Sequence, residues 1–310
     1  MTLSVLLMSS FVSASAVGAG ASGFCLRRMG IETAVLPTTL MGRHPGWGPP
    51  GGGAVPAAQL REMWDAVDQQ PLIFDAVMTG YMGEAAHISL AADIIKQVKK
   101  KNPAAKALID PVMGDAGRLY VAPDIAEAVK TRLVPLADIL TPNLWELSFL
   151  TGEDYATLLQ SPLRAAKAAR GLSKAPSAAA AGTEVLVTSV PFPPNKTESS
   201  QDIQDMIGSV LVRKGHEPLF ISHEKFARVP HGGGDTLAAA YLARRLNGER
   251  AEISLAKSMG SIFQIMSTAA SREAAARTAM SEIPLTAAQD ALINPEPLEV
   301  IDFSKKFLQG

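Results

Sequence analysis

Short apolar runs that alternate with longer amphipathic stretches are the feature that most constrains the fold of this chain. The amphipathic stretches Ala85–Lys100 and Pro123–Leu133 are predicted helices and lie between runs of strand length. Strands that are apolar on both faces and separated by helices are typical of a parallel sheet covered on both sides. The sequence therefore predicts an α/β protein with helices flanking a mostly parallel central sheet. The predicted strands are Ser4–Met8, Thr33–Leu36, Leu72–Met78, Ala107–Ile109, Asp138–Leu140 and Glu184–Val187.

The chain shows no internal repeat and no composition shift that marks a domain boundary, so we expect one domain over residues 1–310. Met41–Pro56 holds six glycines and four prolines, too many for a helix or a central strand, and is predicted to be a flap. Our hypothesis is that this flap closes over bound ligands and excludes water. Ser173–Gly182 is predicted as a surface connection, and the segment after Gln204 as an antiparallel patch.

Charge and cysteine usage exclude several classes of protein. The formal net charge is −1 with both signs interspersed, which indicates neither a nucleic-acid partner nor an anionic membrane partner. The single cysteine, Cys25, excludes an internal disulfide and a multi-cysteine zinc site, and its apolar neighbours predict a core residue. No apolar run reaches the ~18 residues that span a bilayer. The first apolar run lacks the positive flank of an export signal, so we expect a cytoplasmic protein.

Polar residues follow one predicted strand after another. In an open parallel sheet, ligands bind beyond the carboxyl ends of the strands, so these residues are expected to share one edge. Any one of them would pass as an ordinary turn residue, and the repetition is what favours a site. They are Ser9 and Ser10, Thr79 to Tyr81, Asp110, Thr141 with Asn143, and Thr188 with Ser189.

The sharpest motif is "HGGGDTLAAAYLARRL", in which Gly232, Gly233 and Gly234 lead into Asp235 and a helical run. Free N–H groups at a helix N-terminus attract phosphate oxygens, and glycines let the backbone approach a ligand closely. A carboxylate beside such an anion hole suits a base that deprotonates a hydroxyl during phosphoryl transfer. The alternative is that Asp235 only caps the helix.

Three carboxylates, Asp110, Asp115 and Glu146, are available at the same edge for Mg²⁺, which prefers hard oxygen ligands. Their alternative is that they are solvated loop acids. The glycines of Gly18–Gly23 spell the dinucleotide pattern G-x-G-x-x-G, but they lie too far beyond the first predicted strand. No acid closes the second strand, and the chain has no P-loop motif. Both of these nucleotide-binding classes are therefore excluded.

Five segments together resemble the pyridoxal kinases of the ribokinase-like superfamily. They are "SVLLMSSFV" at the start, "TGYMG" (79–83), "DPVMGDAGRLYV" (110–121), "TPNLWELSFLTG" (141–152) and "GGGDTLAA" (232–239). The resemblance spans nearly the whole chain. It implies a three-layer α/β/α kinase that is homodimeric, uses ATP and Mg²⁺, leaves room for a monovalent cation, and phosphorylates the 5′-hydroxymethyl group of pyridoxal.

The resemblance also implies roles for particular residues. Asp235 is implied as the catalytic base, and Gly232 to Gly234 as the anion hole for the transferring phosphoryl group. Asp110, Asp115 and Glu146 are implied to organise the metal ion. The implied substrate side is Ser10, Val17, His44, Pro45, Gly46, Tyr81 and Asp235. The implied nucleotide side is Asp110, Asp115, Tyr120, Thr141, Asn143, Glu146, Thr188, Ser189, Lys225 and Phe226.

Three positions depart from the family pattern. Phe11 follows Ser10 where a histidine is common, Pro45 and Gly46 replace side chains that contact substrate, and "GGGD" stands for "GTGD" or "GVGD". The first two changes bear on the preference among pyridoxal, pyridoxine and pyridoxamine, and the absence of a side-chain donor at Pro45 and Gly46 predicts weak discrimination among them. The alternatives are a hydroxymethylpyrimidine kinase, which often has cysteine in place of Asp235, and a catalytically silent vitamin B6-binding protein. A sugar kinase is disfavoured because its glycine-rich N-terminal segment is missing.

Overall fold

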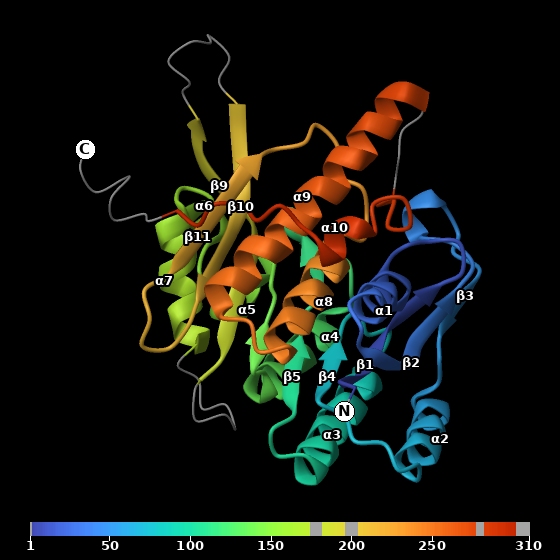
Figure 1. Cartoon of the computed structure of the whole chain (residues 1–310). Helices are drawn as coiled ribbons and strands as arrows, with labels where there is room; N and C mark the ends of the chain where they lie inside the picture. The colour runs from blue at the N-terminus through green and yellow to red at the C-terminus, as the bar shows by residue number, and fades with distance from the viewer. Residues whose placement is uncertain (1, 174–181, 196–203, 277–281, 302–310) are drawn as a thin grey trace.

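The computed structural model describes residues 2–173, 182–195, 204–276 and 282–301. In this part of the chain, a nine-stranded sheet has the order β11-β10-β9-β8-β5-β4-β1-β2-β3 (Figure 1). The pairs from β2 through β1, β4, β5 and β8 to β9 are parallel, whereas β3, β10 and β11 join antiparallel. The predicted mostly parallel sheet and the antiparallel patch after Gln204 are both confirmed. The strands are β1 Ser4–Val12, β2 Glu32–Met41, β3 Gly52–Ala54, β4 Ala76–Thr79, β5 Lys106–Ile109, β8 Ile139–Leu140, β9 Glu184–Asn195, β10 Gln204–Val212 and β11 Leu219–Glu224; a separate hairpin pairs β6 Gly114–Asp115 with β7 Arg118–Leu119.

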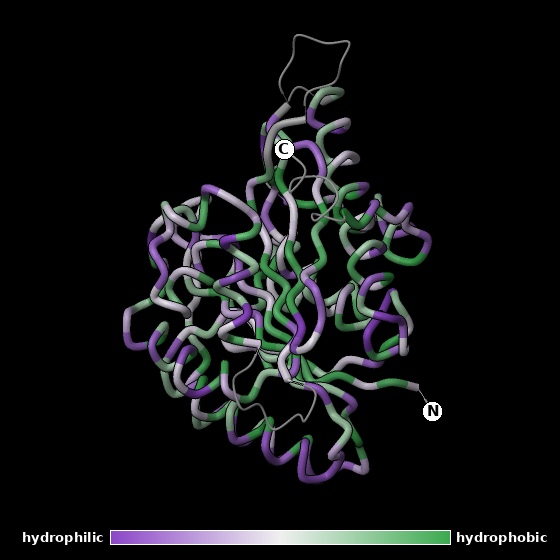
Figure 2. The backbone as a smooth tube through the Cα atoms, turned by 90° about the vertical axis from the view of Figure 1, so that its left-hand side faces the viewer, coloured by the Kyte–Doolittle hydropathy of each residue, from purple (hydrophilic) through white to green (hydrophobic). Residues whose placement is uncertain are grey.

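Helices cover both faces of the sheet and produce two hydrophobic cores. Successive strand residues point to opposite faces, so Val5 and Leu7 of β1 join one core while Leu6 and Met8 join the other. Figure 2 shows the apolar strands running through the centre, between the more polar outer helices. The first face of the sheet is the one that carries Val5 and Leu7, and its helices are α1 Gly18–Arg28, α8 Gly233–Leu246, α9 Ala251–Ala276 and α10 Asp290–Ile293. Those of the second are α2 Ala57–Asp68, α3 Ala85–Lys101, α4 Pro123–Ala128, α5 Leu144–Thr151, α6 Tyr155–Leu158 and α7 Pro162–Ser173, with the short turns η2 Val129–Leu133 and η3 Val134–Leu136.

Several predicted strand boundaries are wrong. The run Leu72–Met78 yields a strand only from Ala76, and Leu72 and Ile73 are exposed because they precede the sheet. β1 continues past Met8 to Val12, so Ser9 and Ser10 lie within the strand rather than after it. β2 likewise continues through Pro37, and beyond it the register with β1 shifts between Ser9 and Phe11, with the extra residue in β2.

The predicted flap contains a short 3₁₀ turn, η1 Pro45–Trp47, and the edge strand β3. β3 pairs antiparallel with the end of β2, with Ala54 opposite Thr39. The flap is therefore anchored at both ends by β2 and β3, while residues 42–51 form its tip. Residues 174–181, which form most of the predicted surface connection, lie outside the described chain.

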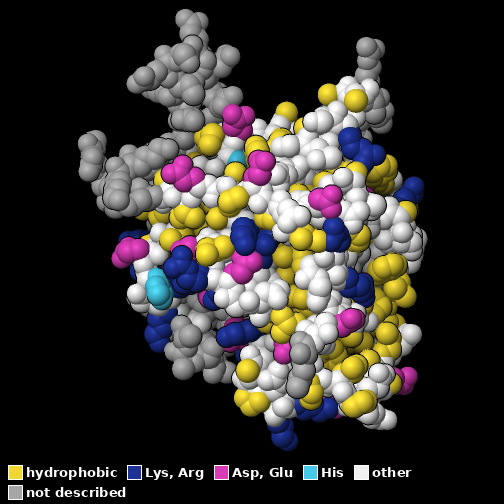
Figure 3. Space-filling view, viewed as in Figure 1, with side chains coloured by type: hydrophobic (Ala, Val, Ile, Leu, Met, Phe, Trp, Pro, Cys, Tyr) yellow, Lys and Arg dark blue, Asp and Glu magenta, His cyan; other side chains and the backbone are white. Residues whose placement is uncertain are grey.

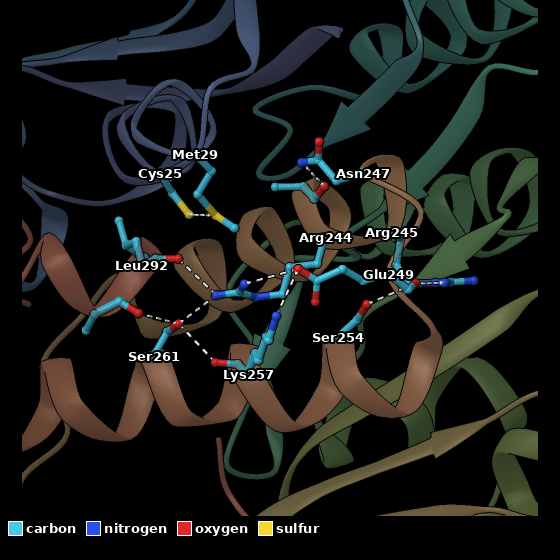
Figure 4. A network of polar contacts seen from close by, with 12 residues as sticks. Cys25, Met29, Arg244, Arg245, Asn247, Glu249, Ser254, Lys257, Ser261 and Leu292 are labelled. Carbon is cyan, nitrogen blue, oxygen red and sulfur yellow. Dashed lines mark hydrogen bonds and ion pairs between the residues drawn. The ribbon is translucent and has the colours of Figure 1, made fainter. Parts of the chain in front are cut away.

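A buried arginine ties the first face together (Figure 4). Arg244 of α8 is only 3% exposed, and its Nη2 donates to Ser261 Oγ of α9 (3.2 Å) and to the Leu292 carbonyl of α10 (2.9 Å). Cys25 is fully buried nearby, and burial raises the pKa of its thiol to about 12, although Arg244 opposes this shift. Cys25 is thus a core residue, as predicted, and not a nucleophile.

No helix within the described residues is long and apolar enough to cross a membrane.

Candidate active site

The N-terminus of α8 opens at the carboxyl edge of the parallel strands. Gly232 is the N-cap residue, with φ 98°, and a Cβ there would lie 2.1 Å from the carbonyl oxygen of Ala16. Only glycine fits this left-handed conformation and close approach. The first N–H groups of a helix have no intrahelical acceptor, so those of the first turn of α8 are available to an anion. A Cβ at Gly234 would meet no heavy atom within 4 Å, so this side of the turn is open.

Asp235 lies in the first turn of α8 and does not cap it. The N-cap residue is Gly232, and the structure records no side-chain cap for this helix. The carboxyl group instead accepts a hydrogen bond from the Gly18 N–H, and its Oδ1 lies 4.0 Å from where a Gly80 Cβ would be. Burial raises its pKa above the usual value, and the Gly18 N–H opposes that shift. The alternative that Asp235 is only a helix cap is wrong.

Small residues of α1 let α8 approach closely enough to fix Asp235. Ser22 Oγ donates to the Asp235 carbonyl (3.1 Å), and Cys25 Sγ donates to the Thr236 carbonyl (3.7 Å). Gly18 begins α1 with φ 54°, and a Cβ there would lie 2.4 Å from Ser10 Oγ. The predicted role of these glycines in helix packing, rather than in dinucleotide binding, is consistent with this geometry.

Asp110, which directly follows β5, and Glu146, in the first turn of α5, are both buried. Asp110 Oδ1 accepts a hydrogen bond from Thr141 Oγ1 (3.0 Å), and burial together with the negative charge of Asp235 raises its pKa to about 8. Both Glu146 oxygens accept backbone N–H groups, from Met113 (3.0 Å) and Asn143 (2.9 Å). Burial raises the pKa of Glu146, and so does the charge of Asp110.

Glu146 and Asn143 form a capping box at the start of α5, because the Glu146 N–H in turn donates to Asn143 Oδ1 (2.9 Å). Asn143 Nδ2 also donates to the Gly114 carbonyl (2.8 Å). These two predicted nucleotide-side residues therefore hold the loop that follows Asp110 in place.

Asp115 lies in the β6–β7 hairpin, and Tyr120 directly follows it. Asp115 is exposed, and its Oδ1 accepts the N–H of Ala116 (2.7 Å). Tyr120 is half-exposed at 52%; partial burial raises its pKa, and so do the charges of Glu146, Asp110, Asp235 and Asp115. The fold thus brings the four predicted acids around one tyrosine.

The donor set fits a divalent cation that is bound jointly with phosphates. Among the described residues, no three His, Cys, Asp or Glu side chains converge as ligands of one metal ion. Mg²⁺ commonly takes one or two carboxylates and completes its shell with water and substrate phosphates. The mutual repulsion that raises the pKa of Asp110 would be relieved by a cation at this edge.

The predicted substrate residues line the end of β1 and the loops around it. Ser10 and Val17 are each 6% exposed, and Val17 is the N-cap residue of α1. Tyr81 follows β4, and burial raises its pKa; its carbonyl accepts Thr38 Oγ1 (2.6 Å). Ser9 Oγ is buried without a hydrogen-bond partner in the described chain.

The flap contacts the residue that precedes the glycine motif. The His44 and His231 rings stack with centroids 4.4 Å apart and planes 25° apart. Gly46 packs on this pair, whereas Pro45 and Gly46 offer no polar side chain to a ligand. Sequence reasoning missed His231, and also Glu282, which accepts the Ala16 N–H (2.8 Å). The only signal in the sequence was the position of His231 next to Gly232.

The predicted nucleotide side extends along β9. Thr188 and Ser189 lie within this strand rather than after it, at a register shift against β10. Ser189 has φ 57°, an uncommon conformation for a residue other than glycine. Phe226 packs against His223 and Phe263, with ring centroids 5.8 and 5.5 Å away, while Lys225 is exposed.

A glycine-capped helix with a carboxylate in its first turn, at the carboxyl edge of this sheet, defines a small-molecule kinase of the ribokinase-like fold. The description "phosphomethylpyrimidine kinase" belongs to the family model that matches residues 53–274. The chain belongs to this family, and two of the relatives that it resembles over nearly its whole length are named pyridoxal kinases.

The relatives cover almost the whole chain. It is 31% identical over 301 residues to pyridoxal kinase PdxY of Corynebacterium diphtheriae, with 94% of this chain and 96% of the relative covered. It is 32% identical over 302 residues to pyridoxal kinase PdxY of Rubrobacter xylanophilus, with 94% of each covered. The resemblance to pyridoxal kinases is confirmed.

Solved structures share the fold. The pyridoxal kinase of Entamoeba histolytica superposes with a TM-score of 0.82 at 24% identity, covering 97% of this chain and 99% of that one. The pyridoxal kinase of Leishmania donovani in complex with ADP and pyridoxine gives 0.77 at 21% identity, covering 95% and 97%.

Proposed function

We propose that this enzyme transfers the γ-phosphoryl group of ATP to the 5′-hydroxymethyl group of pyridoxal. The observation that carries the proposal is the position of Asp235, a carboxylate that does not cap its helix and lies beside the open N-terminus of α8. The relatives named as pyridoxal kinases support the substrate, and the Leishmania donovani complex with ADP and pyridoxine supports both ligand classes.

Asp235 acts as the base in this reaction. As the hydroxyl oxygen bonds to phosphorus, its proton passes to the Asp235 carboxylate, and the bond between phosphorus and the ADP oxygen breaks. Burial raises the pKa of Asp235, which makes it a better proton acceptor than an exposed aspartate. The Gly18 N–H favours the ionised form of the carboxyl group and orients it. The free N–H groups at Gly232–Asp235 stabilise the charge on the transferring phosphoryl oxygens.

Other residues position the two substrates. Ser10, Val17 and Tyr81, with the flap residues His44 to Gly46, hold the pyridine ring. Asp110 would hold Mg²⁺ together with the ATP phosphates, and Glu146 would act beside it by shaping the loop. When bound, Mg²⁺ supplies charge neutralisation for the phosphates. The proposed nucleotide wall is Asp115, Tyr120, Thr141, Asn143, Thr188, Ser189, Lys225 and Phe226, and a monovalent cation is the remaining candidate ligand.

Two alternatives are less well supported. A hydroxymethylpyrimidine kinase shares the family description, but the relatives at 31% and 32% identity are pyridoxal kinases. A silent vitamin B6-binding protein has no need of a buried, uncapping Asp235 beside a free helix N-terminus.

We also propose that the whole chain is one kinase domain, that it works in the cytoplasm and that it forms a homodimer. One continuous sheet with a core on each face supports the single domain. An apolar groove of about 760 Å³ between α1, β2 and α2, lined by Phe11, Leu40 and Met63 among others, supports the dimer.

The test is ADP release with Mg-ATP and each of pyridoxal, pyridoxine, pyridoxamine and hydroxymethylpyrimidine. We expect turnover of the three vitamers, with kcat/KM values within roughly tenfold of one another because Pro45 and Gly46 supply no discriminating side chain. Asp235→Asn should lower kcat by at least ~10²-fold and leave nucleotide affinity unchanged or slightly tighter. Turnover of hydroxymethylpyrimidine alone, or near-normal turnover by Asp235→Asn, would contradict the proposal.

A further inference from the structure

The flap makes a specific contact with His231, a residue that neither the sequence motif nor the reaction requires. His231 precedes the N-cap residue of α8, and its ring stacks on that of His44 with centroids 4.4 Å apart. Imidazole rings attract each other in this arrangement when both are neutral, and two imidazolium ions repel. The contact therefore links the position of the flap to the protonation state of two histidines.

A hydrogen bond within the flap favours the neutral form of His44. The Gly46 N–H donates to His44 Nδ1 (3.1 Å), so this nitrogen carries a lone pair and the ring is not an imidazolium. The same bond caps η1, since His44 is the N-cap residue of that turn. A proton on Nδ1 would break the cap and place two donors face to face.

The contact also reaches the walls of the active site. The His231 carbonyl accepts the Ile283 N–H (3.1 Å), and His231 forms a bridge with Glu282. The Glu282 carboxylate accepts the Ala16 N–H (2.8 Å) and the Ser15 hydroxyl. Ala16 in turn packs against Gly232. The flap tip, the β1–α1 loop and the start of α8 therefore meet at the imidazole pair.

We propose that His231 is a positioning residue that holds the flap over the vitamin B6 substrate through its stack on His44, and that protonation of His44 releases the flap. This inference rests on the proposed function, because it assigns the flap to the substrate of that same site. It predicts that substrate capture weakens as the pH falls, while the chemistry at Asp235 keeps its own pH dependence.

The charges around the pair agree in sign with this inference. Burial lowers the pKa of His44 below 6.5, and the neighbouring His231 lowers it further, whereas Glu282 raises it. Arg43 on the flap is occupied elsewhere, because its Nε donates to the Pro49 carbonyl (2.8 Å). A histidine whose pKa is depressed in the closed state stabilises that state above its ordinary pKa of 6.5. This stabilisation is lost as the pH falls below that value.

The first experiment compares KM and kcat for pyridoxal between about pH 8 and about pH 6, where imidazoles titrate. In the wild-type enzyme the KM for pyridoxal should rise as the pH falls. His231→Ala loses the stack, so its KM at the higher pH should be raised about two- to tenfold, with a smaller change in kcat. His231→Phe keeps an aromatic partner for His44, so its KM should stay low at the higher pH and still rise as the pH falls, because His44 can still be protonated. His216→Ala, an exposed histidine at the opposite edge of the sheet, should keep the wild-type profile.

The second experiment needs no substrate and so separates this inference from the proposed function. NMR titration of the histidine rings, assigned with His44→Asn and His231→Phe, should give a His44 pKa below its ordinary value. In His231→Ala the pKa of His44 should rise. An ordinary His44 titration that is unchanged in His231→Ala would overturn the inference. A KM for pyridoxal in His231→Ala that equals the wild-type value at the higher pH would overturn it as well. Coupled titrations in a chain without kinase activity would count against the proposed function only.

Discussion

At the residue scale, the acids and the glycines of the site could be predicted from the sequence, because residue type and spacing alone indicate their chemistry. Asp235 after three glycines, and polar residues after each strand, predicted a phosphoryl-transfer site, and the fold brings Asp110, Asp115, Glu146 and Asp235 around Tyr120. The detailed roles were less accessible. The hydrogen bond from Met113 to Glu146 and the His231 stack depend on contacts with distant segments, which no local pattern encodes.

The buried Asp110 destabilises the fold when it is ionised, and this yields a prediction that depends on pH. Burial, with the charge of Asp235, raises its pKa from 3.8 to about 8. A carboxyl group with a raised pKa stabilises the fold at acid pH, and that stabilisation is lost as the pH rises toward 8. In EDTA-treated protein at a pH above 8, where the wild-type Asp110 is ionised, Asp110→Asn should therefore increase the free energy of unfolding, by on the order of 1–3 kcal/mol.

The same substitution should matter much less near pH 5, where the buried Asp110 is already mostly protonated. Thermal unfolding at the two pH values measures the difference. The control is Asp115→Asn, since Asp115 is exposed and its replacement should change stability little at either pH. Equal effects of Asp110→Asn at both values would show that Asp110 is not held in its neutral form.

At the element scale, the sheet and its order of helices followed from apolar periodicity, whereas strand ends did not. β1 and β9 run on through serine and threonine because the neighbouring strands continue to offer hydrogen-bond partners. Leu72 and Ile73 look like strand residues but precede β4 and remain exposed. Propensity alone cannot report where a tertiary partner begins or ends.

The start of α8 gives a matched pair of substitutions. Gly232 has φ 98° and touches the Ala16 carbonyl, so Gly232→Ala should destabilise the protein by at least about 1–2 kcal/mol. Gly234→Ala places its Cβ in open space within the helix, so it should be neutral or stabilising by up to about 1 kcal/mol. Chemical denaturation of both variants measures the contrast, and similar losses in the two would contradict the role of Gly232 as the obligatory left-handed cap.

At the scale of the whole molecule, the side that carries α1 and β2 exposes several large apolar side chains close together. A groove of about 760 Å³ runs between α1, β2 and α2, and it is lined by Phe11, Phe24, Val35, Pro37, Leu40 and Met63, among others. Phe11 is 41% exposed and Leu40 is 49% exposed. Figure 3 shows hydrophobic side chains gathering on the side of the molecule that carries α1 and β2. Phe11, which departs from the family pattern, thus lines this groove.

A second copy of the chain is the proposed occupant of this groove. Stable dimers typically bury about 1,200–2,000 Å² in total and concentrate apolar side chains at the centre of the contact. The measured molar mass should therefore be about twice 32.7 kDa by light scattering after size exclusion. Leu40→Glu places a charge inside the contact and should shift the protein to a monomer with an unchanged circular dichroism spectrum. Leu72→Glu is the control, because Leu72 is similarly exposed at 41% but lies outside the groove. A wild-type monomer, or a Leu40→Glu dimer as stable as that of Leu72→Glu, would place the dimer contact elsewhere or remove it.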